Sequence, residues 1–296
     1  MVFDTPQIPP PRPSSVPPEP ALPPRLPTTK LSDGTRVHCV RRAEARVLDH
    51  HVQGYLEHGI TVADGDIVFD VGANIGLMGV RACQRHADVQ VYAFEPVPTI
   101  YEACRRNAEA HGSGRFHVFN VGLSAAPGEA RFTWYPNAPA LSTARPEDWE
   151  ADPGAWREAV RGQLRAMPAD MWWARMVPGF LLPLVAWFLK QGAVDVVCPL
   201  RTLSSFLDEA SIERIDLLKI DCEGFELDVL QGIRSDHWAR IGQVVVEVHD
   251  QGGRADTVEQ LLRSHGLSHI VREKEEAFVE TDLINLYARR SAPDAS

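Results

Sequence analysis

The chain has 296 residues, of which 44% are apolar and 24% are charged, as expected for a globular protein with a sizeable core. Its 40 acidic and 30 basic side chains give a net charge of −10, which argues against a nucleic-acid substrate because nucleic-acid-binding proteins usually carry a basic patch. The five cysteines are odd in number and lack metal-site spacing, and the N-terminus lacks a secretory signal pattern. We therefore expect reduced thiols and a cytoplasmic protein.

The first 29 residues are dense in proline and show neither a helix nor a strand pattern, so we expect residues 1–29 to form a disordered tail. We assign residues 30–296 to one catalytic domain. Its first part, residues 30–65, is expected to form a collar. Asp33-Gly34 between alternating residues predicts a hairpin, and a helix is expected over roughly residues 43–58.

From residue 66 onward, apolar runs alternate with helical patterns, which predicts an α/β fold with a doubly wound sheet covered by helices on both faces. We expect the last two strands to form an antiparallel edge. Seven strands are predicted, at residues 67–71, 89–94, 116–121, 217–221, 244–248, 269–273 and 283–289.

The first predicted strand runs into the turn Asp-Val-Gly-Ala-Asn-Ile-Gly at residues 70–76. Gly72 and Gly76 allow the backbone to approach a ligand closely, and Glu95, which follows the second strand, is placed to accept hydrogen bonds from both hydroxyls of a ribose. The turn lacks the Gly-x-Gly-x-x-Gly spacing of a dehydrogenase dinucleotide site, and Asp70 would repel a pyrophosphate. S-adenosylmethionine carries an ammonium and a sulfonium but no phosphate, so charge favours it. The alternative is an ordinary turn in which Asp70 only caps a helix.

From about residue 31 to residue 290 the sequence resembles the FkbM family of S-adenosylmethionine-dependent methyltransferases. The Lys-Ile-Asp-x-Glu-Gly block at residues 219–224 is its most diagnostic part, since the first glycine turn occurs in many methyltransferases. The resemblance implies a class I methyltransferase (Rossmann-like) fold, S-adenosylmethionine as cofactor, and acceptor hydroxyls on polyketides, sugars and related products. The segments that carry it lie in the family's order at residues 69–76, 93–96, 120–124, 128, 218–226, 229–232 and 245–249.

The donor site is expected to be built from side chains at the ends of the strands. Asn120 and Ser124 match the family loop after the third strand and are expected beside the adenine, although Ser124 also suits a turn or helix cap. Lys219 has core-like neighbours, so we expect it to form a structural ion pair with a buried carboxylate. The donor-binding residues that we assign are Asp70, Gly72, Asn74, Gly76, Glu95, Asn120, Ser124 and Asp221.

The catalytic residues that we assign are His249, Asp221 and Glu223, because ligands of open α/β sheets bind outside the carboxyl ends of the strands. Methyl transfer to oxygen is an in-line displacement that needs an aligned acceptor and a base for its proton. His249 has the most suitable unperturbed pKa, while Asp221 or Glu223 orients the acceptor or acts instead. A purely structural His249 stays open. We assign no metal, although these residues together with Glu247 also suit magnesium.

Residues 146–196 fall largely outside the resemblance. Five of the seven tryptophans, at positions 149, 156, 172, 173 and 187, lie in this insertion. Its apolar run at residues 176–189 contains two prolines and is too short and broken for a membrane-spanning helix. We interpret the insertion as a lid that presents an apolar wall to the acceptor. A contact between the subunits of a homodimer and a membrane-surface element are the alternatives.

These patterns together predict methyl transfer from S-adenosylmethionine to a hydroxyl oxygen of a small molecule with an apolar portion, and the resemblance points to a secondary metabolite. N-methylation and a non-catalytic S-adenosylmethionine-binding scaffold are the alternatives. The intact set of Asp70, Glu95 and Asp221 argues against a scaffold. The acceptor itself is not encoded by the fold or by the donor site.

Overall fold

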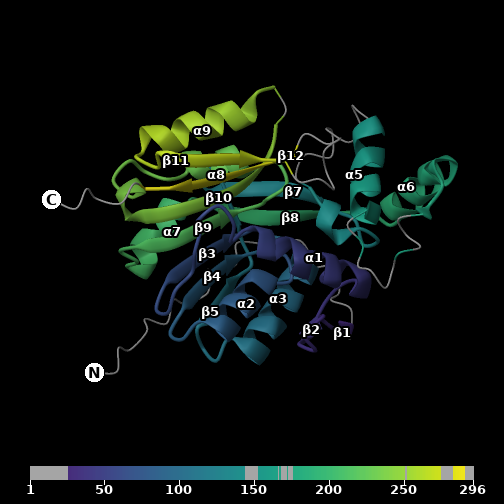
Figure 1. Cartoon of the computed structure of the whole chain (residues 1–296), viewed down its shortest axis with the longest axis horizontal. Helices are drawn as coiled ribbons and strands as arrows, with labels where there is room; N and C mark the ends of the chain where they lie inside the picture. The colour runs from purple at the N-terminus through teal and green to yellow at the C-terminus, as the bar shows by residue number, and fades with distance from the viewer. Residues whose placement is uncertain are drawn as a thin grey trace.

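The computed structural model describes residues 26–143, 153–165, 167, 172, 176–250, 252–274 and 283–290. The predicted tail up to residue 25 lies outside this part, as do Trp149 and Trp173 of the insertion. The described chain forms a large central sheet with helices on both faces, a small second sheet and a pair of helices beyond one end of the large sheet (Figure 1).

The central sheet has seven strands in the order β11-β12-β10-β9-β3-β4-β5, and all seven predicted strands are present. The expected antiparallel edge is present, because β11 and β12 pair antiparallel with each other at one edge of the sheet. Only β12 runs antiparallel to its neighbours, and β11, which pairs antiparallel with β12, points the same way as the other five. β11 has this direction because helix α9 connects β10 to β11 and returns the chain to the end of the sheet at which the parallel strands begin. The strands are β3 (Ile67–Val71), β4 (Gln90–Phe94), β5 (Phe116–Phe119), β9 (Ile215–Ile220), β10 (Ile241–His249), β11 (His269–Glu273) and β12 (Leu283–Arg289).

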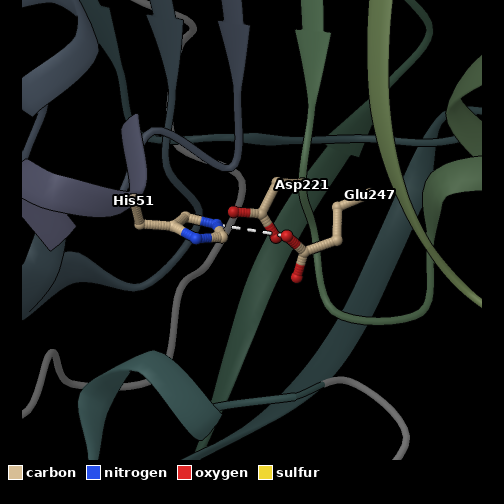
Figure 2. Close-up of side chains that lie close together, drawn as sticks. All are labelled: His51, Asp221 and Glu247. Carbon is tan, nitrogen blue, oxygen red and sulfur yellow. Dashed lines mark ion pairs between the residues drawn. The ribbon is translucent and has the colours of Figure 1, made fainter. Parts of the chain in front are cut away.

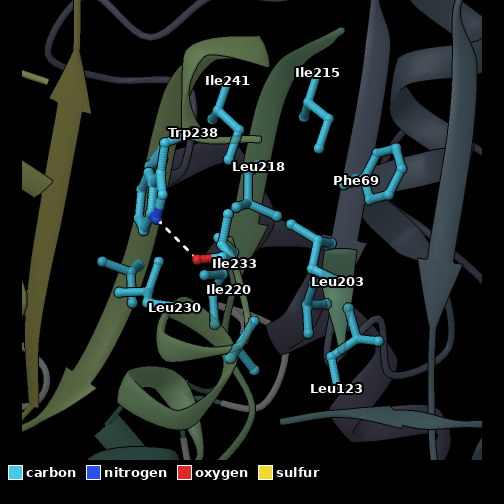
Figure 3. Close-up of a cluster of buried hydrophobic side chains, with 14 of the residues drawn as sticks. Phe69, Leu123, Leu203, Ile215, Leu218, Ile220, Leu230, Ile233, Trp238 and Ile241 are labelled. Carbon is cyan, nitrogen blue, oxygen red and sulfur yellow. Dashed lines mark hydrogen bonds between the residues drawn. The ribbon is translucent and has the colours of Figure 1, made fainter. Parts of the chain in front are cut away.

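Helices cover both faces of this sheet, as the doubly wound prediction requires (Figure 1). The strands are buried on both sides because their apolar side chains point into two separate cores. In the core beside α7 and α8, the indole of Trp238 donates a hydrogen bond to the Ile233 carbonyl at 3.2 Å (Figure 3). One face carries α2 (Leu77–Arg85) and α3 (Pro98–His111), and the other carries α7 (Leu203–Ala210), α8 (Glu226–Gln231) and α9 (Arg254–Ser264).

The N-terminal collar has the predicted hairpin and helix: β1 (Thr28–Lys30) pairs antiparallel with β2 (Arg36–His38), and α1 (Arg42–Gly54) follows. Ordered structure begins earlier than predicted, because Leu26 is buried in a cluster with other collar side chains. The buried guanidinium of Arg81 in α2 fixes the collar, since it lies 2.7 Å from the Asp49 carboxylate of α1.

A second sheet, which the sequence analysis did not predict, joins the two ends of the insertion. Its order is β6-β8-β7, with β7 antiparallel to β8 and β6 parallel to it. β8 begins inside the predicted insertion, so the last residues assigned to the insertion belong to this sheet. Its strands are β6 (Gly122–Leu123), β7 (Gly128–Trp134) and β8 (Val194–Arg201).

The described insertion contains two helices, with α5 (Pro153–Arg165) packed against α6 (Leu182–Lys190). Trp156 is buried between them and donates a hydrogen bond to the Ala186 carbonyl at 3.0 Å. Figure 1 places this pair beyond the end of the central sheet at which α1 also lies. Among the helices that the structure describes, none combines the length and the apolar character needed to cross a bilayer. Three short 3-10 helices complete the described elements: η1 (Pro139–Leu141), η3 (Gly179–Leu181) and η4 (Trp238–Arg240).

Candidate active site

Two glycines shape the turn that follows β3. Gly72 and Gly76 have φ values of 70° and 79°, a region that other residues rarely adopt. A Cβ atom on Gly72 would lie 1.7 Å from the carbonyl oxygen of Asp221, and one on Gly76 would lie 2.6 Å from the sulfur of Cys104. In the structure, these glycines allow close contact between segments of the protein itself. Gly72 packs against Asp221, the residue that follows β9.

Glu95 lies directly after β4 and is held over this turn. Its carboxylate accepts hydrogen bonds from the backbone N–H groups of Asn74 at 3.0 Å and Val97 at 2.9 Å. Burial raises the pKa of Glu95 to about 8. The side-chain amide of Asn120 donates to the carbonyls of Glu95 and Pro96, both at 2.9 Å. Glu95, Asn74 and Asn120 therefore form one connected group beside the glycine turn.

The predicted structural ion pair of Lys219 is present. The register between β3 and β9 places it opposite Asp70, and its ammonium lies 3.0 Å from the Asp70 carboxylate. The same ammonium donates to the Gly72 carbonyl at 2.8 Å and lies 3.7 Å from the Asp221 carboxylate. Because Lys219 balances the charge of Asp70, Asp221 is the carboxylate of this group whose charge is not fully balanced.

His51 of helix α1 and Tyr55, which caps the C-terminus of this helix, are two site side chains that the sequence analysis missed. The hydroxyl of Tyr55 donates to the Asp221 carboxylate at 2.8 Å, and the Nε2 atom of His51 lies 3.1 Å from the Glu247 carboxylate. Burial opposes ionisation of Asp221, but the Lys219 ammonium, His51, the Tyr55 hydrogen bond and His249 together outweigh it and lower the pKa of Asp221. The i, i+4 spacing of His51 and Tyr55 was a readable signal, because such residues share one helix face.

Glu223 and His249 form a pair next to this group. Glu223 lies in the turn after β9 with a φ of 53°, His249 is the last residue of β10, and their side chains approach to 3.2 Å. Burial alone would lower the pKa of His249, but the hydrogen bond and charge of Glu223 raise this pKa to about 10. The ring therefore carries a proton at neutral pH. The ordinary histidine pKa, on which the choice of His249 rested, is therefore shifted upward in this structure by Glu223.

Most of the predicted site residues are thus brought to the carboxyl end of the sheet in two adjoining groups. Asp221, Glu223 and His249 lie at the ends of β9 and β10, and the remaining donor residues except Ser124 surround the glycine turn. Ser124 is buried at the end of β6, where its N–H group donates to the Arg201 carbonyl at 2.8 Å, and it has no hydrogen bond to Glu95 in the described structure.

The donor set suits a cationic cofactor without phosphate. Asp70 is buried, and its carboxylate pairs with the Lys219 ammonium at 3.0 Å. The parallel strands, the glycine turn and the carboxylate after the second strand define a class I S-adenosylmethionine-dependent methyltransferase. Residues 70–268 match the model described as "Methyltransferase FkbM domain", and the chain belongs to this family.

Known proteins similar to this chain agree with the family. The curated "31-O-demethyl-FK506 methyltransferase FkbM" of Streptomyces tacrolimicus is 36% identical over 90% of this chain and 97% of its own length. "Methyltransferase 1" of Beauveria bassiana is 28% identical over 88% of this chain and 97% of its length. The solved structure of M. capricolum TrmK with S-adenosyl-homocysteine covers 81% of this chain and 67% of that chain, at 9% identity and a TM-score of 0.41. This TM-score is below 0.5, so the fold assignment rests on the strand order of the central sheet and not on this similarity.

Proposed function

We propose that this methyltransferase transfers the methyl group of S-adenosylmethionine to a hydroxyl oxygen of a small molecule with an apolar portion, a secondary metabolite. The observation that carries the proposal is the contact of Gly72 with the Asp221 backbone, because it sets the donor turn directly beside the carboxylates that face an acceptor. The 36% identity to a relative named as a 31-O-demethyl-FK506 methyltransferase supports oxygen as the acceptor atom.

On the donor side, S-adenosylmethionine supplies a methyl group bound to a positively charged sulfur. Glu95 accepts hydrogen bonds from the ribose hydroxyls, and its two backbone donors keep its carboxylate oriented for this. Asn120 fixes the loop that carries Glu95, and we assign Ser124, further along the same segment, to the adenine side. The ionised Asp221 offers negative charge to the cationic end of the donor.

On the acceptor side, the hydroxyl oxygen attacks the methyl carbon in line with the sulfur. One oxygen–carbon bond forms, the carbon–sulfur bond breaks with its electron pair going to sulfur, and the acceptor proton leaves. Because the His249 ring is already protonated, we assign proton acceptance to the Glu223–His249 pair as a unit, with Asp221 orienting the hydroxyl. Catalysis then depends on both members of the pair.

We assign the insertion the role of a lid over an apolar acceptor. α6 presents Leu184, Trp187 and Phe188 with 57–61% of their surface exposed. Two contacts tie this region to the site: the Thr143 hydroxyl donates to the Glu223 carbonyl at 3.1 Å, and Asn137 donates to the Phe188 carbonyl at 3.2 Å. The exposed apolar face gives the acceptor a surface to contact near the strand ends. A homodimer through the same face is the second candidate, which the same exposed side chains favour.

A product-mass assay tests the transfer. The purified chain is incubated with S-adenosylmethionine and pairs of apolar compounds that differ only in carrying a hydroxyl or an amine at one position. We expect one methyl to be added to hydroxyl compounds alone. Methylation of the amine partners would instead favour N-methylation. Binding of S-adenosylhomocysteine without turnover of any compound would favour the non-catalytic scaffold.

A further inference from the structure

Three side chains from three different elements converge beside the proposed acceptor position. His51 comes from α1, Asp221 follows β9 and Glu247 lies near the end of β10 (Figure 2). One ligand atom of each lies within 4.8 Å of the other two, and the His51 Nε2 atom lies 3.1 Å from a Glu247 oxygen. All three are at least three-quarters buried, so the group is not a chance cluster on the surface.

The spacing matches a shared ligand. Two atoms that bind one cation at about 2.1 Å and at right angles to each other lie about 3.0 Å apart. The distance of 3.1 Å between the His51 Nε2 atom and the Glu247 oxygen is close to this value. The ligand atoms of all three residues lie within 4.8 Å of one another, so Asp221 would move inward to bind the same cation.

The charge at this position calls for a cation. With the neutral His51 ring that a metal ligand requires, Lys219, Asp70, Asp221 and Glu247 comprise one ammonium and three carboxylates, a net charge of −2. Lys219 lies nearer to Asp70 than to Asp221. Glu247 is about nine-tenths buried, and one of its carboxylate oxygens lies 3.1 Å from the His51 Nε2 atom. Buried carboxylates this close together normally require a countercharge.

We propose that His51, Asp221 and Glu247 form a divalent-cation site. One imidazole and two carboxylates make a mixed donor set that suits a first-row cation such as Mn²⁺. The existence of the site rests on this geometry alone. Its role rests on the proposed function: a cation held here would bind the acceptor oxygen and lower the pKa of its hydroxyl.

The second group of this kind in the described structure, Glu57, His58 and Glu273, supplies a comparison. Its glutamate at position 57 and its histidine are exposed, whereas the side chains of His51, Asp221 and Glu247 are at least three-quarters buried. Weak surface binding of a cation at this group must be separated from binding at the proposed site.

The test is a Mn²⁺ titration of the full chain after removal of metals with EDTA and desalting. Electron paramagnetic resonance measures free Mn²⁺, whose signal is lost on binding. We expect one Mn²⁺ per chain, and a reduction in affinity of about tenfold or more in both His51→Ala and Glu247→Gln. His50→Ala is the matched control, because His50 is the exposed neighbour on the same helix and should leave binding unchanged. Circular dichroism melting checks that each variant is folded.

The proposal is overturned if wild-type protein takes up no Mn²⁺ at concentrations up to about 1 mM. It is equally overturned if folded His51→Ala and Glu247→Gln bind Mn²⁺ like the wild type, or if His58→Ala alone removes binding. Calorimetry with S-adenosylhomocysteine on the metal-free protein separates this result from the proposed function. Donor binding without Mn²⁺ binding rejects only the cation site, whereas Mn²⁺ binding without donor binding counts against the methyl-transfer site.

Discussion

Replacing Gly72 with alanine tests whether the contact between the donor turn and Asp221 is as tight as the structure has it. The new Cβ atom would lie 1.7 Å from the Asp221 carbonyl oxygen, and contacts under 3.0 Å are essentially never observed. The carbonyl must therefore retreat by about 1.3 Å, which also disturbs the hydrogen bond of 3.0 Å from the Asp221 N–H group to the Val71 carbonyl.

The expected cost has two parts. A φ of 70° disfavours alanine by about 1–2 kcal/mol, and disrupting a buried backbone hydrogen bond adds about 1–3 kcal/mol. We expect Gly72→Ala to lower the free energy of unfolding by about 3–4 kcal/mol. Gly114→Ala is the control. Gly114 has a φ of 80°, but a Cβ atom at this position would meet no other atom within 4 Å, so this variant carries the backbone cost alone.

The assays are urea unfolding and calorimetry with S-adenosylhomocysteine. We expect Gly72→Ala to weaken donor binding by about tenfold or more, since Asp221 and the turn are displaced together, and Gly114→Ala to bind normally. If the two variants lose equal stability and both bind the donor like the wild type, the contact between the turn and Asp221 does not organise the site.

Glu95→Ala should weaken S-adenosylhomocysteine binding by about tenfold to a hundredfold through loss of charge-assisted hydrogen bonds. The wild-type affinity should rise as pH increases through about 8, where Glu95 ionises. Equal pH profiles of affinity for the two proteins would remove Glu95 from the site. His249→Ala should lower turnover by about a hundredfold with donor affinity unchanged, and full activity would leave alignment as the whole mechanism. The folded-state pKa of His249 lies above its unfolded value, so its stabilising contribution is complete below about pH 6.5 and is lost as pH rises through about 10; His249→Gln should flatten urea-measured stability across that window. Leu184→Ser and Trp187→Ser should raise the acceptor KM and spare donor binding, whereas a dimer that becomes monomeric in sedimentation would make α6 a subunit contact.

The sequence by itself determined the central sheet and the donor turn, because local sequence patterns specify both. Apolar runs of strand length specify the seven strands, and a strand followed by a glycine turn specifies the start of α2. Glu95 could be placed directly after the second strand because the apolar run of that strand ends at the preceding residue. Even the ion pair of Lys219 was predictable, since a lysine between core residues must find a buried carboxylate.

Only the tertiary structure decided which residues from distant segments meet at the strand ends. His51 and Tyr55 reach Asp221 and Glu247 across more than 160 residues of sequence, and nothing in their own helix indicates which surface it will cover. The second sheet was missed for the same reason, because β7 pairs with β8, which lies at the far end of the insertion in the sequence. The proton affinity of His249 also depends on a neighbour that the fold supplies. Local patterns specify elements, whereas contacts between elements and the charges they bring together arise only when the chain packs.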